Sequence, residues 1–344
     1  MTCSTTLSSA AVVRAPVQTL GWVTIRPRLA VTAAMLLSAT LVFTDADPQD
    51  SQPPAPGQPR FTLSPDPHGQ TLRTPDGRTV FRYLTEKPPE SNLAANSACC
   101  LYPLNTPAGV RVVDLAPGDH RHHRGVFLAW HSMTFGETRA DFWGWGAHTP
   151  TEDRVIRNRS LQLESGDAQQ AVVAVRNDWF IGDRVVLEEA LRIIVRERAQ
   201  AYVIDLDFTL TPRVGVTLDR SAFGGFCVKG RQDGQGAFYG PQGRITLPAP
   251  HHLKPESDWP AAAWYNYTIQ LDQGPTVGVA VFDHPGNPPT LWHNIAGIAM
   301  TNPCIVAPAA VEWDADQPQR LRYRLVVHDG PPPFDLLAAL GGTW

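Results

Sequence analysis

Hydrophobic and polar residues alternate along much of the chain beyond residue 60, most clearly in residues 202–210. One set of alternating positions is apolar and comprises Tyr202, Ile204, Leu206, Phe208 and Leu210. The intervening set is largely acidic and comprises Val203, Asp205 and Asp207, with Thr209 after them. A period of two is the signature of a β-strand with one face buried. This segment is therefore predicted to be a half-buried strand.

Further β-like runs follow one another, separated by segments rich in turn-forming residues. They cover residues 79–83, 154–163, 171–181, 185–195, 201–211, 276–282 and 321–328. The 32 prolines and 27 glycines also favour turns, and the only modest helical pattern lies at residues 334–340. Many strands joined by turns predict an all-β protein with little helix, in which residues 61–344 form one large antiparallel β-sandwich domain.

The N-terminal segment has a different pattern. Residues 1–44 contain no Asp or Glu, carry three arginines and end in an apolar run at residues 29–43. This pattern is typical of a signal peptide or a membrane-anchor-like leader, and the run is shorter than the roughly 18 apolar residues of a full span. Residues 45–60 are polar and proline-rich, which predicts a linker. We expect an exported protein, in the periplasm, the cell envelope or the extracellular space, that meets a membrane only through an uncleaved leader.

Charge and cysteine content limit the expected binding partners, disulfides and metal sites. The formal net charge of -4 gives no general attraction to nucleic acid. Beyond the leader there are four cysteines, Cys99, Cys100, Cys227 and Cys304. They permit three disulfide pairings, and buried free thiols are an equally good interpretation. No CxxC pair is present, so a structural zinc ribbon is not expected.

Residues 119–125, Asp-His-Arg-His-His-Arg-Gly, concentrate imidazole and guanidinium groups in one short segment. Imidazoles transfer protons near neutral pH, and arginines bind oxygen-rich groups through paired donors. If residues 120–124 are extended, alternate side chains point to opposite faces. We assign proton transfer or hydroxyl binding to His122 and His123, and ligand binding to His120, Arg124 and the nearby His131.

A second motif, Asp141-Phe142-Trp143-Gly144-Trp145-Gly146, alternates large side chains with glycines. Glycines let the backbone turn while the indoles project, and indoles stack on the apolar faces of sugar rings. We therefore expect Trp143 to be a stacking platform and Asp141 to be the carboxylate partner of the histidines. The competing interpretation is that these aromatic residues belong to the core.

Two later segments add candidates. Lys229 and Arg231 would share one face of a strand, where two cations favour a carboxylate, a phosphate or a sugar acid. The segment Asp283-His284-Pro285-Gly286-Asn287 looks like a rigid turn that presents its side chains. His284 in this turn and His293 after it are candidates for proton transfer or hydroxyl binding, and Asn287 is a candidate for ligand binding. The alternatives are a solvated or ion-paired strand edge for Lys229 and Arg231, and a structural network of the histidines with neighbouring carbonyls and acids.

These motifs, in this order, resemble the bacterial PmoA-like family, often labelled methane oxygenase PmoA. The resemblance covers roughly residues 60 to 330 and rests on several segments. They are residues 102–104, 106–109, 120–125, 141–144, 283–288 and 292–293. The resemblance implies that the motif around His284 recurs in the family together with a following Trp-His pair, here Trp292-His293. The label of the family implies a metal-dependent oxygenase. The fold also resembles the galactose-mutarotase-like supersandwich.

The sequence lacks GxSxG, Walker and GxGxxG motifs, which leaves serine hydrolases, nucleotidases and dinucleotide-dependent enzymes without support. The mixture of His, Arg and Trp instead predicts a pocket for a carbohydrate or related polyhydroxylated compound. His and carboxylate groups there allow acid–base catalysis, whereas tryptophans without such a pair would make a non-catalytic binding or envelope-interaction module. No cofactor is predicted, and a divalent metal stays an alternative.

Overall fold

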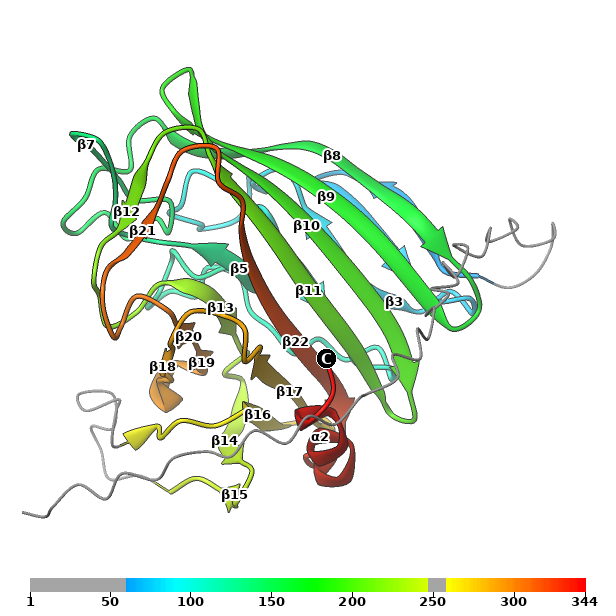
Figure 1. The fold of residues 1–344 in the computed structure, drawn as a ribbon. Helices are drawn as coiled ribbons and strands as arrows, with labels where there is room; N and C mark the ends of the chain where they lie inside the picture. The colour runs from blue at the N-terminus through cyan, green and yellow to red at the C-terminus, as the bar shows by residue number, and fades with distance from the viewer. Residues whose placement is uncertain (1–59, 247–257) are drawn as a thin grey trace, which may run out of the picture. The chain divides into compact units, whose positions relative to one another are not determined.

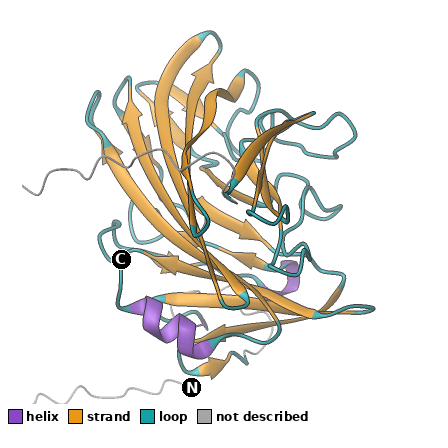
Figure 2. Ribbon diagram, turned by 90° about the vertical axis from the view of Figure 1, so that its right-hand side faces the viewer, coloured by secondary structure: helices purple, strands orange, loops and turns teal. Residues whose placement is uncertain are grey.

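The computed structural model describes residues 60–246 and 258–344. The chain divides into two units, Met1–Gln52 and Pro53–Trp344, and the second contains every described residue. The predicted leader and all of the predicted linker except Arg60 lie outside the described residues. Within the second unit the prediction of an all-β antiparallel sandwich with little helix is confirmed (Figures 1 and 2).

The largest element is a nine-stranded antiparallel sheet, whose long strands β8 to β11 stand out in green in Figure 1. In spatial order its strands are β15 (Gly243–Arg244), β14 (Gly234–Gly240), β16 (Trp264–Leu271), β17 (Thr276–Asp283), β22 (Gln319–Asp329), β11 (Ala201–Pro212), β10 (Arg184–Arg198), β9 (Gln170–Ile181) and β8 (Arg154–Gly166). The strands foreseen from the alternating pattern beyond residue 150 all lie in this sheet. Clear alternation therefore belongs to long strands with one face on the core.

A seven-stranded sheet faces the nine-stranded one. Its order is β1 (Thr62–Asp66), β2 (Gly69–Arg73), β3 (Thr79–Leu84), β4 (Cys100–Leu104), β5 (Val126–Ala129), β13 (Gly225–Lys229) and β19 (Met300–Thr301). The apolar core lies between the two sheets. For example, Phe226 of β13 and Tyr323 of β22 stack with ring centroids 4.1 Å apart. The core thereby joins segments that are far apart in the sequence.

The remaining elements are short. A four-stranded sheet contains β21 (Val311–Trp313), β12 (Val216–Leu218), β6 (Met133–Phe135) and β7 (Thr138–Ala140), and a two-stranded sheet contains β18 (Leu291–Trp292) and β20 (Pro303–Cys304). The described helices are the single-turn η1 (Ala296–Ile298) and α2 (Phe334–Gly341), which confirms the helical pattern at residues 334–340.

Strand β11 shows how tertiary packing modifies the pattern. Its predicted apolar face is buried, and Asp205 and Asp207 on the opposite face are partly exposed. Val203 lies on that outer face but is only 3% exposed, because it belongs to a buried apolar cluster that includes Leu337 of α2. The sequence predicted the two faces correctly, and α2 explains the exception.

The expectation of an extended backbone at residues 120–124 is wrong. The amide of His120 donates to the carbonyl of Pro117, and the amide of His123 donates to the carbonyl of His120, so the segment forms consecutive turns. The three histidines therefore do not alternate between two faces. The question of the cysteines is also answered: Cys99, Cys100, Cys227 and Cys304 are buried free thiols.

Candidate functional site

The turns bring His120, His122 and His123 together, and we call these three residues the histidine cluster. The rings of His120 and His123 stack with centroids 5.0 Å apart, and His122 meets His123 edge-on at 4.6 Å. His123 is buried, whereas His120 and His122 are partly exposed. The cluster thus has a buried and an accessible side.

Two aromatic residues, Trp143 and Phe223, connect the histidine cluster to more distant candidates. Trp143 lies edge-on to His123, with ring centroids 5.7 Å apart, and Phe223 lies 5.9 Å from Trp143. Phe223 in turn contacts His131 at 4.5 Å and His293 at 5.9 Å. Residues from three separate sequence regions therefore form one continuous group of rings.

Trp145 is the exposed part of this group. Its side chain is 39% exposed, and its ring lies 5.3 Å from both His131 and Phe223. We use the term cluster site for the histidine cluster together with Trp143, Phe223, His131, His293 and Trp145. The cluster site offers imidazole nitrogens and aromatic rings within one contiguous area.

Burial determines the protonation of the histidines. It lowers the pKa of His122 to about 4 and that of His123 to about 2, and neighbouring imidazoles and cations add to the effect. Burial also lowers the pKa of His131, whose Nε2 lies 2.7 Å from the hydroxyl oxygen of Ser221. These imidazoles are therefore neutral at pH 7, each with one donor and one acceptor nitrogen.

A carboxylate and a lysine accompany the histidine cluster. Asp119 Oδ2 lies 3.2 Å from His120 Nδ1. Burial raises the pKa of Asp119, but the bond to His120 and the charge of Lys229 outweigh it and lower the pKa. Asp119, which the sequence reasoning did not single out as a site residue, is thus the carboxylate in contact with the cluster. Its position directly before His120 was the available signal.

Asp141, the carboxylate expected beside the histidines, has a different role. Its two oxygens accept hydrogen bonds from the amides of Gly144 and Gly146, each at 2.7 Å. Burial raises its pKa, and these amide bonds oppose the rise. Asp141 therefore fixes the turn of the aromatic motif, and its oxygens do not contact the histidine cluster.

The same turn determines which of the two tryptophans is accessible. Gly144 has a φ of +93°, and a Cβ there would lie 2.5 Å from Ala95, so only glycine fits. This left-handed residue interrupts strand alternation, and Trp143 points inward with no exposed surface while Trp145 points outward. The assignment of stacking to Trp143 is corrected accordingly, because the accessible indole is Trp145.

Arg124 is a structural residue in this fold, contrary to the expected ligand anchor. It is fully buried, and its guanidinium donates to the carbonyls of Ala98, Phe142 and Trp143 at 2.9 to 3.1 Å. It also lies over the ring of Phe127 at 4.4 Å. Arg124 thereby joins the histidine turn to the aromatic motif, and its donors are directed at the backbone.

Lys229 and Arg231 do not converge on one ligand. Lys229 is fully buried, and its Nζ donates to the Gln232 side chain and the Ile298 carbonyl; burial lowers its pKa to about 8. Arg231 pairs with Asp233 and donates to the carbonyl of Arg111. The expected two-cation face is therefore replaced by one buried lysine near the cluster and one ion-paired arginine.

The segment at residues 283–287 is the end of β17 followed by a turn, and no ring contact among the described residues links it to the cluster site. Asn287 donates to Asp283 and to the carbonyl of Arg322, and accepts from the amide of Arg322, at 2.7 to 2.9 Å. His284 Nδ1 accepts from the amide of Gly286, and its ring lies 4.5 Å from Trp344. His284 and Asn287 are therefore occupied within the turn.

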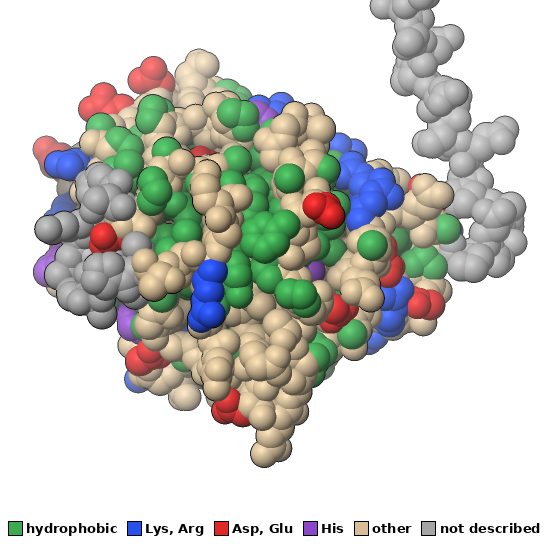
Figure 3. Space-filling model, turned by 90° about the horizontal axis from the view of Figure 1, so that it is seen from below, with side chains coloured by type: hydrophobic (Ala, Val, Ile, Leu, Met, Phe, Trp, Pro, Cys, Tyr) green, Lys and Arg blue, Asp and Glu red, His purple; other side chains and the backbone are tan. Residues whose placement is uncertain are grey.

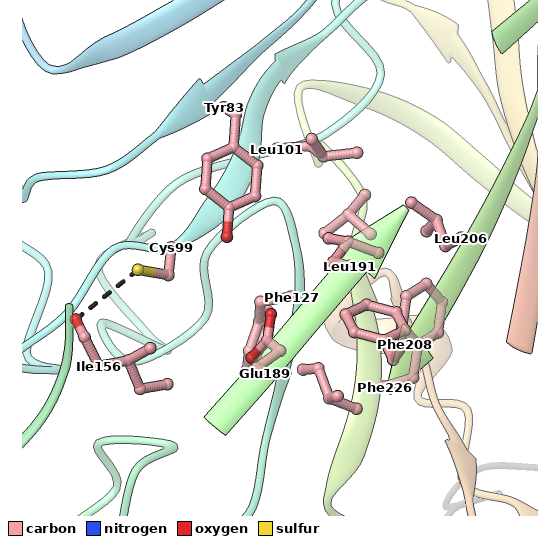
Figure 4. A pocket seen from close by; sticks show the side chains of 12 residues that line it. Tyr83, Cys99, Leu101, Phe127, Ile156, Glu189, Leu191, Leu206, Phe208 and Phe226 are labelled. Carbon is pink, nitrogen blue, oxygen red and sulfur yellow. Dashed lines mark hydrogen bonds between the residues drawn. The ribbon is translucent and has the colours of Figure 1, made fainter. Parts of the chain in front are cut away.

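Behind the cluster lies a small internal cavity of about 20 Å³ with Glu189 in its wall (Figure 4). The carboxylate of Glu189 accepts hydrogen bonds from Asn177 and Trp179, both at 2.9 Å, and burial raises its pKa to about 7. Phe127 lines the cavity and also contacts Trp143 at 4.7 Å. This volume holds about one water molecule. The cavity is therefore a small space in the core with one acidic side chain in its wall, and not a ligand pocket.

Within residues 60–246 and 258–344, no group of three or more His, Cys, Asp or Glu side chains has an arrangement suited to a metal ion. In the same residues, no helix has the length and apolar character to span a membrane.

The comparison with known families gives a match over residues 71–340 to a family of unknown function, DUF6807. The chain belongs to this family. The resemblance to the PmoA-like family is therefore wrong, and the oxygenase alternative, which came from that family's label, loses its basis. None of the curated proteins matches the chain.

Several solved structures resemble this DUF6807 chain at low identity. A galactose mutarotase related enzyme from Lactobacillus acidophilus is 7% identical, with a TM-score of 0.35, and the match covers 78% of this chain and 97% of that one. An α-galactosidase from Lactobacillus brevis is 9% identical, with a TM-score of 0.36, and the match covers 78% of this chain and 38% of that one. A GH36 α-galactosidase from Geobacillus stearothermophilus is 7% identical, with a TM-score of 0.37, and the match covers 79% and 39%, respectively.

Proposed function

We propose that the cluster site binds a carbohydrate or a related polyhydroxylated compound. The observation that supports this proposal most strongly is the continuous group of rings from the histidine cluster through Trp143 and Phe223 to the exposed Trp145. It combines hydrogen-bonding nitrogens with an accessible indole. A sugar presents the matching combination of hydroxyl groups and apolar C–H faces.

Neutral imidazoles suit hydroxyl groups. The pKa of His122 is lowered to about 4, so its ring is uncharged at pH 7 and offers one donor and one acceptor. A sugar hydroxyl also donates one hydrogen bond and accepts others. His122, which is partly exposed, would contact the ligand directly, while the buried His123 holds it in place through the 4.6 Å edge-on contact.

Trp145 would supply the stacking platform. Its ring lies edge-on to His131 and to His148, with interplanar angles of 84° and 87°. These contacts hold the indole in one orientation, which lowers the entropy lost on binding. An indole fixed in this way and 39% exposed can cover one face of a pyranose-sized ring.

The test is a thermal-stability screen of the full chain against neutral sugars, sugar acids and polyols, followed by calorimetric titration of any hit. A ligand that binds only the native state raises the melting temperature. We expect a sugar-specific shift that Trp145→Ala and His122→Ala each reduce. Loss of one stacking platform costs about 1.4 kcal/mol or more, which is about a tenfold loss in affinity.

Phe334→Ala is the matched control, because Phe334 is similarly exposed, at 38%, and lies on α2 outside the cluster site. It should leave the affinity unchanged. If Trp145→Ala and His122→Ala fold normally and bind the same sugar as tightly as the unmodified chain, the ligand is bound elsewhere. A screen without any shift would contradict carbohydrate binding itself.

A second candidate is acid–base catalysis on the same ligand, which the pair of Asp119 and His120 favours. A carboxylate beside an imidazole orients the ring and stabilises its charged form during proton transfer. Product analysis of a bound sugar by NMR, with Asp119→Asn and His120→Gln in parallel, separates the two candidates. Turnover lost in both variants with affinity retained supports catalysis, and binding without turnover supports the non-catalytic module.

Export is also proposed, on the pattern of residues 1–44. Fractionation of the native cells and N-terminal sequencing of the mature chain test it. A mature protein that begins within residues 30–60 and lies outside the cytoplasm would agree with the proposal, whereas an intact cytoplasmic chain would contradict it.

A further inference from the structure

A separate groove lies between α2 and the hairpin of β10 and β11, on the outer face of the nine-stranded sheet. Its volume is about 280 Å³, close to the lower end of about 300–1,000 Å³ for ligand pockets. It is lined by three arginines, Arg196, Arg198 and Arg324, by Trp344, and by leucines of α2. Figure 3 views the molecule from below, the side on which Figure 1 draws α2. Apolar side chains gather in the middle of this face.

Positive charge exceeds negative charge in this groove. Arg196 and Arg324 share a single carboxylate, that of Asp205, at 2.9 and 2.5 Å. The side chain of Arg198 is exposed, and among the described residues it has no hydrogen bond or ion pair. Three guanidinium groups face the carboxylate of Asp205 and the terminal carboxylate of Trp344, which leaves one positive charge in excess.

The remaining wall is apolar. Trp344 is 42% exposed, and its ring lies between the guanidinium of Arg324, at 4.7 Å, and the ring of His284, at 4.5 Å. Leu336 and Leu340 of α2 also line the groove. A cationic end beside an aromatic and aliphatic wall is complementary to a molecule that carries both an anionic and an apolar part.

We propose that this groove binds a small amphipathic carboxylate, with its carboxylate on Arg198 and its apolar part against Trp344. A guanidinium binds a carboxylate through two parallel hydrogen bonds, which a neutral group cannot reproduce. An inorganic anion could bind the guanidinium groups, but it has no apolar part that would pack against the apolar wall of the groove. The site is independent of the cluster site and of the function proposed for it.

The probe is 3-phenylpropionate, titrated calorimetrically into the full chain at low ionic strength. Two matched compounds separate its parts: 3-phenylpropionamide keeps the ring but has no charge, and propionate keeps the charge but has no ring. We expect saturable binding of 3-phenylpropionate and binding about tenfold weaker, or more, for each of the other two. No saturable binding, or equal binding of the amide, would overturn the proposal.

Protein variants then locate the bound probe. Arg198→Gln and Trp344→Leu should each weaken binding about tenfold, since each removes one of the two recognised parts. Arg192→Gln is the control, because Arg192 lies on the same strand and face but pairs with Glu164 at 3.2 Å and does not line the groove. An equal loss in Arg192→Gln would show general charge attraction, and unchanged binding in both groove variants would place the probe elsewhere; either result overturns the proposal.

Discussion

The histidine turn at residues 120–123 and the turn at residues 283–287 both contain histidine, yet they differ in what their side chains contact. In the second turn Asn287 bonds to Asp283 and Arg322, and His284 Nδ1 accepts from Gly286. In the first, the imidazoles meet one another and the aromatic residues, and His120 and His122 stay partly exposed. Groups that are satisfied within a turn stabilise it, whereas groups left available can bind a ligand.

Arg124 gives the largest expected effect, because the histidine turn depends on it. Arg124→Lys should lower the free energy of unfolding by about 3 kcal/mol or more, since one ammonium group cannot span the three carbonyls that the guanidinium joins. Urea denaturation followed by circular dichroism measures the change. Arg121→Lys, at an exposed neighbour, is the control and should change the stability by less than about 0.5 kcal/mol. Equal stability of the two variants would contradict the bracing role of Arg124.

Asn287→Ala should lower the free energy of unfolding by about 2 kcal/mol. It removes three hydrogen bonds at 2.7 to 2.9 Å and leaves polar groups of Asp283 and Arg322 without these partners. The measurement is again urea denaturation, combined with sugar affinity. Affinity should stay unchanged if this turn is structural. A loss of affinity in a stable Asn287→Ala protein would show that the second turn belongs to the ligand site.

The stability of the protein should fall as the pH drops below 6.5. Burial lowers the pKa of His123 to about 2 and those of His122 and of His328 in β22 to about 4, so these residues stay neutral in the folded state at pH 5 while the unfolded chain takes up protons. Stability is then fully present above the unfolded pKa of about 6.5 and decreases below it, by about 2 kcal/mol for one such group between pH 7.5 and pH 5.

His123→Phe should reduce this dependence when the free energies of unfolding of both proteins are measured from pH 5 to pH 7.5. Glu189 acts in the opposite direction, because burial raises its pKa to about 7 and the folded state holds its proton. Its contribution therefore increases towards acid pH, and Glu189→Gln should make the decline below pH 6.5 steeper. An identical pH profile in His123→Phe would rule out His123 as a source of the dependence.

The smallest expected effect is on sugar affinity, and it distinguishes the histidine turn from the turn at residues 283–287. His122→Ala should weaken the binding of the sugar found in the screen about tenfold, the loss expected for one well-formed contact of about 1.4 kcal/mol. His284→Ala should leave it unchanged, because His284 contacts Trp344 and Gly286. Calorimetric titration of both variants provides the comparison. Equal losses would mean that both turns contribute to one site.

Strand β11 and helix α2 show how much of the fold was predictable. The alternation at residues 202–210 identified the strand and both of its faces, because side-chain direction in a strand depends only on the position along the chain. The short apolar segment at residues 334–340 likewise indicated α2. Neither pattern shows that Leu337 and Val203 join one buried cluster, because that depends on how α2 packs against the sheet.

The candidate site was predictable in its composition but not in its geometry. The sequence identified the histidines, but it selected Asp141 in place of Asp119 and Trp143 in place of Trp145. It did not show that Gly144 turns Trp143 inward and Trp145 outward, or that Asp141 bonds to the amides of its own turn. Phe223, which joins His131 and His293 to the rest, gave no signal, because a lone phenylalanine in a β-rich chain is usually a core residue.

The sequence by itself determined the all-β antiparallel class, the long strands of the nine-stranded sheet and helix α2, because periodicity and turn composition are local properties. Only the tertiary structure decided which histidines meet, which tryptophan is exposed and which charges are satisfied. These features depend on contacts between β5, β13 and the loops that flank them, which are distant in the sequence. Burial then sets the pKa values of His122 and His123, and burial is a property of the whole fold.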